Sequence, residues 1–398
     1  MDLDRATASE LAADTAKMSV RVLCDLEELK PYLADWEGLA AAAAEPNAFY
    51  EAWMLMPALQ RFGAGKALLL VLVFATDPAR PETPLLCGFF PLERQRSFKG
   101  LPIRHLKLWR HLHCFLTTPL IRAGTARETL EALFGWLATD ARSGALMEFT
   151  LIAGEGPCHQ ALVDHLHRSS RPHRSLECYT RALFRPAADA DTYLSAALSG
   201  KHRRKIKHQE KQLAALGRIE YDALGPGDDI DARIEEFLKL EASSWKGREG
   251  TALASDEAQR SYFEAIVREA FRRGQLRMLA LRLDGRPIAY KCDFLAGDGS
   301  FTFKIAFDES YARYSPGLLL ELHNIQRLHA QSRTGWVDSC THAENFMFNR
   351  LWLGRRTIES RVVSTGKAPG DLVIAMLPLL AWLSRKLLRR RASPEGPQ

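Results

Sequence analysis

Hydrophobic and polar positions follow a similar order twice along this chain. In the second half, two helical patterns precede three apolar segments of strand length, and a helix and two more strands follow. These segments are helices near 231–243 and 256–273, strands at 277–283, 287–294 and 301–307, a helix from Pro316, and strands at 336–339 and 357–364. The turns Asp284-Gly285 and Gly297-Asp298-Gly299 join the three strands, which predicts an antiparallel meander.

The first half shows the same order with little sequence identity. Its segments are a strand at 20–23, helical stretches at 26–44 and 48–62, strands at 67–75, 85–92 and 104–109, a helix from Thr125 to about 142, and a strand at 146–152. A weak internal repeat of about 170 residues is therefore predicted, with an α/β (α+β) fold in each copy.

We place the domain boundaries where these patterns change. The predicted units are a flexible tail at 1–18, an N-terminal domain at 19–182, a C-terminal domain at 183–366 and a helix with a tail at 367–398.

The strand at 301–307 and the helix after it are the best-specified part of the chain. Alternation predicts one apolar face, formed by Phe301, Phe303, Ile305 and Phe307. In the next segment Ser315 is a suitable N-cap, Pro316 suits the first helical position, and Gly317 leaves room for a ligand beside the first turn. Such a helix start attracts anions, usually phosphate, because its N–H groups and dipole face the ligand. The alternative is an ordinary packed helix.

Composition excludes several classes of protein. The chain has 398 residues, 46% hydrophobic and 26% charged, with a net charge of +6 that permits phosphate-bearing partners without requiring nucleic acid. Its seven cysteines form no Cys-x-x-Cys pair, and the pairs His111-x-His113 and His165-x-His167 have no acidic or cysteine partner nearby. We therefore expect no disulfide framework and no metal. The polar N-terminus lacks a signal peptide pattern, and no apolar run reaches spanning length, which predicts a cytoplasmic protein.

Two basic segments leave alternatives open. Residues 200–217 predict a cationic helix, which is either a solvated surface or an arm for the phosphates of a cofactor, a lipid or RNA. Near the C-terminus, twelve apolar residues at 372–383 precede Arg385, Lys386, Arg389, Arg390 and Arg391. The segment 372–391 is either an interfacial helix on an acidic membrane or a helix docked on the protein.

Several motifs together resemble the GNAT-superfamily proteins known as BioF-like or CelD-like acetyltransferases. These motifs are the basic segment 200–217, Ser244-Trp245-Lys246-Gly247-Arg248, the run Ala306-Phe307-Asp308-Glu309, the helix start at 311–320, Asp338-Ser339-Cys340, and 349–356. The likeness covers about 45–365. It implies two tandem GNAT-like domains, each a mixed, mostly antiparallel sheet flanked by helices, as in the related Fem peptidyltransferases. It also implies acyl transfer from a CoA thioester, with no metal. The helix start has one glycine fewer than the usual GNAT pyrophosphate loop, so an acyl carrier protein or aminoacyl-tRNA stays open as donor.

The resemblance and the predicted strand ends together suggest site residues. For the pyrophosphate of acyl-CoA we expect Arg313, Ser315, Pro316, Gly317 and Leu318. For proton transfer we expect Asp308, Glu309 and His342 as base or amine-positioning groups and Tyr314 as the acid for the leaving thiolate. For the acceptor side we expect Lys291, Asp293, Lys304, Trp245, Asn349 and Arg356. Each has a plainer interpretation as a turn acid, an ion-paired ladder or packing.

Three functions follow from these expectations. The first is an N-acyltransferase that modifies an amine on a sugar, a lipid or a cell-envelope or polysaccharide precursor, with its site in the C-terminal domain. The second is a Fem-like ligase that uses aminoacyl-tRNA and holds tRNA with the basic helix. The third is a non-catalytic component of a polysaccharide system that contacts the membrane through 372–391. A covalent acyl-enzyme on Cys340 is a further alternative, against which a buried cysteine after a strand is commoner.

Overall fold

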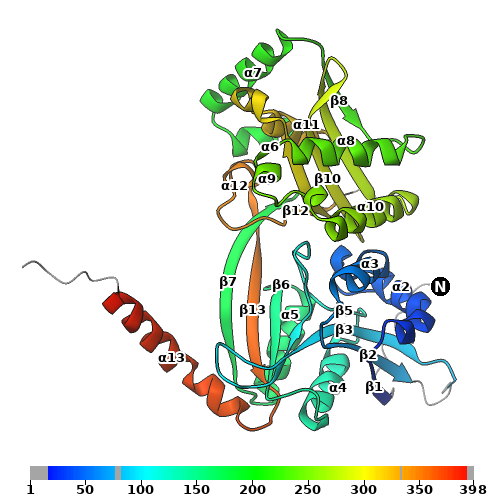
Figure 1. Ribbon diagram of the computed structural model, residues 1–398, viewed down its shortest axis with the longest axis vertical. Helices are drawn as coiled ribbons and strands as arrows, with labels where there is room; N and C mark the ends of the chain where they lie inside the picture. The colour runs from blue at the N-terminus through cyan, green and yellow to red at the C-terminus, as the bar shows by residue number, and fades with distance from the viewer. Residues whose placement is uncertain (1–16, 77–81, 332–333, 392–398) are drawn as a thin grey trace, which may run out of the picture.

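One sheet of thirteen strands runs through both halves of the protein (Figure 1). We describe it from a computed structural model over residues 17–76, 82–331 and 334–391. The strands are β1 (Lys17–Leu23), β2 (Leu68–Thr76), β3 (Leu85–Gln95), β4 (His105–Leu108), β5 (Leu120–Ile121), β6 (Leu146–Ala153), β7 (His173–Phe184), β8 (Ile219–Ala223), β9 (Leu276–Leu283), β10 (Arg286–Ala296), β11 (Gly299–Phe307), β12 (Trp336–Asp338) and β13 (Gly354–Ser364).

Helices cover both faces of this sheet. They are α2 (Leu33–Ala41), α3 (Ala52–Phe62), α4 (Ala126–Thr139), α5 (Pro157–Arg168), α6 (Ala190–Ala197), α7 (Gly200–Ala214), α8 (Ile230–Ala242), α9 (Trp245–Arg248), α10 (Glu257–Arg272), α11 (Pro316–Gln331), α12 (Phe346–Leu351) and α13 (Gly370–Arg391). The short 3₁₀ helices are η1 (Glu27–Tyr32), η2 (Ala48–Tyr50), η3 (Leu253–Ser255) and η4 (Glu309–Tyr314).

The repeated order predicted from the sequence is confirmed. The strands lie in the order β1-β2-β3-β4-β6-β13-β7-β12-β11-β10-β9-β8, with β5 beside β3. In the first half, β2, β3 and β4 form an antiparallel meander, α4 follows, and β6 pairs parallel to β4. In the second half, β9, β10 and β11 form the meander, α11 follows, and β12 pairs parallel to β11. The fold is thus the mixed, mostly antiparallel α/β architecture in two copies.

The long strands β7 and β13 join the two copies. They pair antiparallel from Leu183 opposite Gly354 to His173 opposite Val363. On its other edge β13 pairs with β6, while the end of β7 pairs with β12. Figure 1 shows these two strands running from the upper, C-terminal half into the lower, N-terminal half. The sequence pattern missed β7, and the boundary predicted at 182–183 falls inside this strand.

The predicted alternation of β11 is wrong, because the strand contains a β-bulge. Cys292 of β10 pairs with Lys304, but Asp293 pairs with Thr302, so Phe303 has no partner position. Consequently Phe301 and Phe303 pack with α8 and α10, whereas Ile305 and Phe307 pack on the opposite face with α11.

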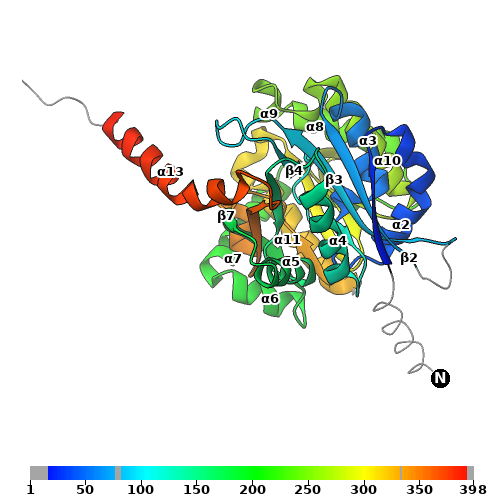
Figure 2. The same cartoon turned by 90° about the horizontal axis from the view of Figure 1, so that it is seen from below.

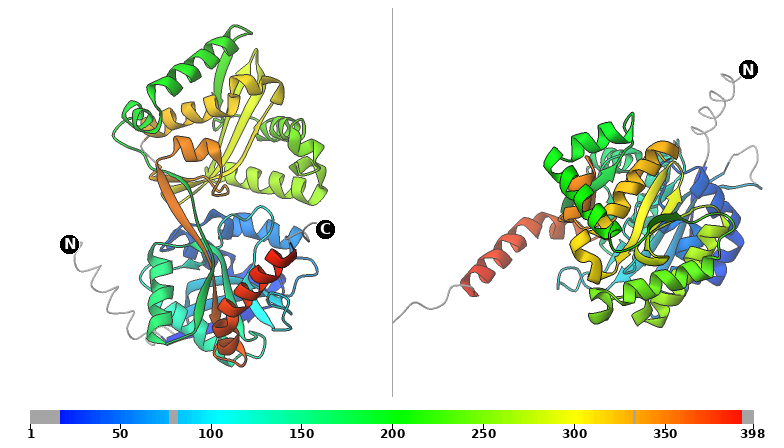
Figure 3. Two further views of the ribbon diagram at one scale, coloured as in Figure 1. Left: turned by 90° about the vertical axis from the view of Figure 1, so that its left-hand side faces the viewer. Right: turned by 90° about the horizontal axis from the view of Figure 1, so that it is seen from above.

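The described chain begins in the sheet and ends in a helix that leaves it. Lys17 and Met18 begin β1, and the rest of the predicted tail 1–18 lies outside the described residues. The first turns of α13 bury Val373, Ile374 and Leu377 against the end of the sheet, and the helix then points away from the body (Figures 2 and 3). None of the described helices has an apolar stretch long enough to cross a membrane.

A buried ion cluster connects β7, β12 and β13. Asp338 accepts from Arg181 at 2.7 Å and from Arg356 at 3.1 Å, and its side chain is 0% exposed. Burial by itself raises the pKa of Asp338, but the two arginine charges outweigh it and leave the pKa below its ordinary value. The carboxylate is therefore charged in the folded protein, and removing it would leave two buried guanidinium groups unbalanced.

We predict that Asp338→Asn lowers the free energy of unfolding by about 3–5 kcal/mol, because one partner of a buried pair is removed. Urea denaturation measures this, with the exposed Asp35→Asn as a control that changes stability by less than about 0.5 kcal/mol. Since the folded pKa lies below the unfolded one, the contribution is complete above about pH 4 and is lost as the pH falls through the folded value. If both variants were destabilised equally, a specific stabilising role of the Asp338 carboxylate would be contradicted.

Candidate active site

The C-terminal half contains a cavity of about 890 Å³ where two parallel strands separate. β11 pairs with β12 only over Gly299–Phe301 opposite Trp336–Asp338. Beyond this point β11 and the segment 339–350 diverge, and the cavity opens between them and the start of α11. We call it the β11–β12 cavity. It is lined by Phe115, Thr302, Phe303, Lys304, Ile305, Phe307, Ala312, Ser315, Pro316, Gly317, Leu318, Ser339, Cys340, Thr341, His342, Glu344, Asn345, Phe346, Met347, Phe348 and Arg350.

Local structure explains why the strands diverge. The bulge at Phe303 bends β11, and Cys340 has a φ of 53° that ends β12 in a turn. Asp338 Oδ1 accepts from the Cys340 N–H at 2.9 Å, which fixes this turn. The corresponding site in the first half is filled, because the loop before α4 hydrogen bonds to β6 through Thr117 and Thr118.

The start of α11 forms one wall of the cavity. Ser315 adopts a left-handed conformation (φ 55°, ψ 53°) rather than the extended backbone of an ordinary N-cap. Its carbonyl accepts from the N–H groups of Leu318 and Leu319, and its own N–H donates to Ala312. Among the described residues the Gly317 N–H has no hydrogen-bond partner, and a Cβ at Gly317 would meet only Phe307, at 4.0 Å. Of the N–H groups expected to bind phosphate, Gly317 is thus the one available.

The basic helix α7 is hydrogen-bonded to the segment that begins α11. Gln209 Nε2 donates to the Arg313 carbonyl at 2.9 Å and to Ser315 Oγ at 3.0 Å. At the first turn of α7, the pKa of His202 is lowered by desolvation and by the charges of Arg350, Lys201 and Lys205. Arg350 itself lines the cavity. Arg350 of α12 therefore lies near the start of α7.

The four residues predicted for proton transfer lie in different surroundings. Of these, only His342 is among the described residues that line the cavity. Asp308 caps η4 by accepting from Ser310 and pairs with Arg286 at 2.8 Å, while Glu309 pairs with Arg248 at 2.6 Å. The Tyr314 ring is buried in the core beside α11. Arg313 stacks on that ring with its guanidinium carbon 4.6 Å from the centroid.

Two of the residues predicted for the acceptor form a buried polar layer instead of a cleft wall. Lys291 Nζ lies 2.6 Å from Glu321 of α11 and 3.6 Å from Asp293, and all three side chains are 1% exposed. Burial raises the pKa of Glu321, although the charge of Lys291 opposes the shift. This geometry fits the ion-paired ladder that the sequence left as the alternative.

The other predicted acceptor residues divide between the cavity and its supports. Lys304 lines the cavity. Asn349 donates to the Ala343 carbonyl at 2.5 Å and so fastens the cavity wall, and Arg356 belongs to the Asp338 cluster. The Trp245 side chain lies outside the described part of the structure.

Sequence analysis missed the wall formed by the start of α12. Asn345 caps α12 by accepting from the Phe348 N–H at 3.1 Å, and Glu344 and Phe346 line the cavity beside it. An Asn three residues before an apolar position is a cap signal that could have located this short helix. The cavity also has Phe115 of the N-terminal half in its wall, which only the tertiary structure places there.

Comparison with known proteins shows which family model and which solved structures the chain is similar to. Residues 200–346 match the family model described as an acetyltransferase (GNAT) domain. No curated protein matches the sequence. The solved structure of FemX is similar with 9% identity and a TM-score of 0.52 over 90% of this chain and 99% of that chain. A conserved protein of unknown function from Bacteroides thetaiotaomicron has 11% identity and a TM-score of 0.50 over 87% and 99%. The similarity to the acetyltransferase (GNAT) domain model is thus confined to residues 200–346. Over the whole chain, the similarity to FemX is one of fold.

We predict that Cys340 is unreactive, because burial and the charge of Asp338 raise the pKa of its thiol well above the ordinary value. Iodoacetamide at pH 8 should modify the exposed Cys24 and Cys178 of the folded protein and leave Cys340 intact. Peptide mass spectrometry measures this, with urea-unfolded protein as the control in which all seven cysteines react. Labelling of Cys340 as fast as Cys24 would revive the acyl-enzyme alternative.

Proposed function

We propose that the protein is an N-acyltransferase that moves an acyl group from acyl-CoA to an amine in a ternary complex. The main observation in favour of this proposal is the cavity that forms where β11 and β12 separate in the second half. The start of α11 and basic side chains line this cavity. The family match of residues 200–346 supports it, because that family is described as acetyltransferase. The acceptor we propose is an amine on a sugar, a lipid or a cell-envelope precursor.

Residues of the β11–β12 cavity suit the parts of acyl-CoA. The Gly317 N–H and the positive end of α11 face the cavity, where a diphosphate would be stabilised. Arg350 and Lys304 add positive charge to the cavity wall. Ile305, Phe307 and Phe346 offer apolar surface for a pantetheine arm and an acyl chain.

The proposed reaction is a direct attack of the amine on the thioester. The amine nitrogen bonds to the carbonyl carbon, the C–S bond breaks, and the thiolate takes up a proton. His342 lines the cavity, and we propose that it accepts the proton from the amine.

We predict that acyl-CoA raises the melting temperature of the wild type and that Gly317→Glu abolishes the shift, because the carboxylate repels the diphosphate. At 100 times Kd the ligand stabilises the folded state by about 2.7 kcal/mol. Differential scanning fluorimetry with acetyl-CoA and long-chain acyl-CoA measures the shift. Gly135→Glu in α4 is the control, because a Cβ at this exposed glycine meets nothing within 4 Å.

If no thioester shifted the melting temperature, acyl-CoA would be contradicted as the donor. That result would favour the alternative, a Fem-like ligase that uses aminoacyl-tRNA. The observation behind this alternative is the exposed cationic face of α7, which contains Lys201, Arg203, Arg204 and Lys205. Binding of tRNA that weakens steeply with salt and is lost in Arg203→Gln/Arg204→Gln would support it.

We also propose that α13 contacts an anionic membrane surface. Its outer side carries exposed Leu372 (62%), Met376 (41%) and Leu379 (51%), spaced as one helical stripe opposite the docked residues. The following sequence has five Lys or Arg residues between 385 and 391 and no acidic residue. Apolar area next to positive charge is the combination that binds anionic lipid.

We predict that the protein co-sediments with phosphatidylglycerol vesicles, less so at high salt, and that Met376→Ser/Leu379→Ser reduces the bound fraction about tenfold or more. Vesicles of phosphatidylcholine test the role of charge. Leu112→Ser, at another exposed leucine (72%), is the control. Equal binding of both variants, or no binding by the wild type, would contradict the proposal.

A further inference from the structure

A second cavity lies at the opposite end of α11 from the candidate active site. Its volume is about 650 Å³, and it shares no lining residue with the β11–β12 cavity. It is bounded by the start of β9, the turn between β10 and β11, and the last turns of α11. We call it the arginine cavity, because Arg277 of β9 and Arg327 of α11 both line it.

The two arginines are incompletely paired. Arg277 Nη2 donates to Thr334 Oγ1 at 2.8 Å, but its buried Nη1 has no hydrogen-bond partner. For Arg327 the buried Nε is also without a partner, and across the described residues its guanidinium makes no hydrogen bond or ion pair. Desolvation lowers the pKa of Arg277; the charge of Asp293 opposes this shift, and the positive charge of Arg327 adds to it. The fold thus leaves buried donors of two neighbouring arginines without partners, at a cost in stability.

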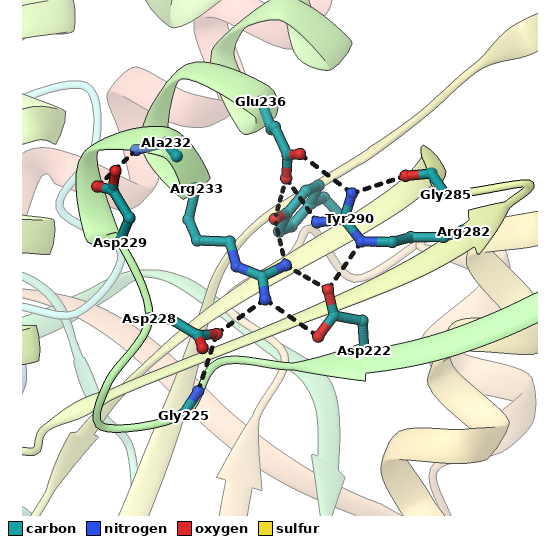
Figure 4. Close-up of polar contacts among 10 residues, drawn as sticks. All are labelled: Asp222, Gly225, Asp228, Asp229, Ala232, Arg233, Glu236, Arg282, Gly285 and Tyr290. Atoms are coloured by element: carbon teal, nitrogen blue, oxygen red, sulfur yellow. Dashed lines mark hydrogen bonds and ion pairs between the residues drawn. The ribbon is translucent and has the colours of Figure 1, made fainter.

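Another arginine of the same strand shows how this protein pairs guanidinium groups elsewhere. On the other face of β9, Arg282 contacts Glu236 at 2.6 Å, Asp222 at 2.7 Å and the Gly285 carbonyl at 3.1 Å. Figure 4 shows this network, in which Arg233 of α8 also bonds to Asp222 and Asp228. No carboxylate in the described structure lies within ion-pair distance of Arg277 or Arg327. The difference indicates that the partner of these two arginines is not among the described residues.

We propose that the arginine cavity binds an oxyanion, the phosphate or carboxylate group of a small molecule, between Arg277 and Arg327. Guanidinium N–H groups match the oxygens of either anion and bind them with charge-assisted hydrogen bonds. Gln331 and Thr334 add polar side chains to the same wall. Asp298 also lines the cavity, and its Oδ1 accepts from Trp336 Nε1 at 3.1 Å. Its carboxylate favours a ligand that carries a hydroxyl or amine group besides the anion.

Calorimetric titration of the full chain with inorganic phosphate, glycerol 3-phosphate and citrate tests the site and separates the two anion types. The ionic strength is kept constant with chloride. We expect saturable binding by the wild type, and a Kd at least about tenfold higher in Arg277→Gln and in Arg327→Gln. Arg268→Gln is the control, because this arginine of α10 pairs on the surface with Asp231 and Glu264 and should bind like the wild type.

A second measurement shows whether Arg327 serves the structure instead. In buffer without these anions, Arg327→Gln should melt at the wild-type temperature or above it, because the substitution removes no described bond and relieves the repulsion of Arg277. A lower melting temperature without anion would overturn the proposal. So would the absence of saturable binding of all three probes, or binding that survives both substitutions. None of these readouts depends on acyl transfer, so the outcome is independent of the proposed function.

Discussion

The attraction between Asp338 and the two arginines around it is the constraint on which the rest of the structure depends. Asp338 ends β12, Arg181 lies on β7 and Arg356 on β13, so one carboxylate joins the second copy of the fold to the strand pair that leads into the first. The same side chain fixes the Cys340 turn, from which the cavity wall diverges. Because the group is fully buried, both arginines must be present for the charge to be tolerated there. The stability of the junction and the shape of the candidate site are therefore coupled.

The two copies share one strand order but differ in what fills the gap between their parallel strands. In the first copy, the loop before α4 hydrogen bonds to β6 and closes the gap. In the second copy the bulge at Phe303, the left-handed Ser315 and the cap of α12 leave it open. A fold common to many functions thus becomes a site through a few local departures from regular structure. The first copy instead contributes Phe115 to the cavity wall and packs α3 on α10, where Arg61 donates to Ser261 at 2.6 Å.

Charged side chains are used in three different ways on the second copy of the sheet. Beside α8, Arg282 and Arg233 form ion pairs with carboxylates of the chain. Under α11, Lys291 and Glu321 form a buried ion pair. Arg277 and Arg327 line a cavity, and buried N–H donors of both have no hydrogen-bond partner. The first two arrangements are complete within the chain and are accounted for by stability. The third is costly to the folded protein, and such a cost is expected where a ligand is bound.

The sequence by itself determined the repeated order of strands and helices, because hydrophobic periodicity, glycine turns and capping residues act over short distances. It also located the helix start at Pro316 and Gly317 beside the cavity. Only the tertiary structure decided which polar residues face that cavity. Alternation along 301–307 could not reveal the bulge, which depends on the pairing with β10. The strand β7 was missed because most of its residues are exposed or half-buried, and its place in the sheet depends on pairing with β13 and β12. Asp308 and Lys291 looked like site residues in the sequence, but their partners Arg286 and Glu321 lie far along the chain or on another element, and those contacts decide their role.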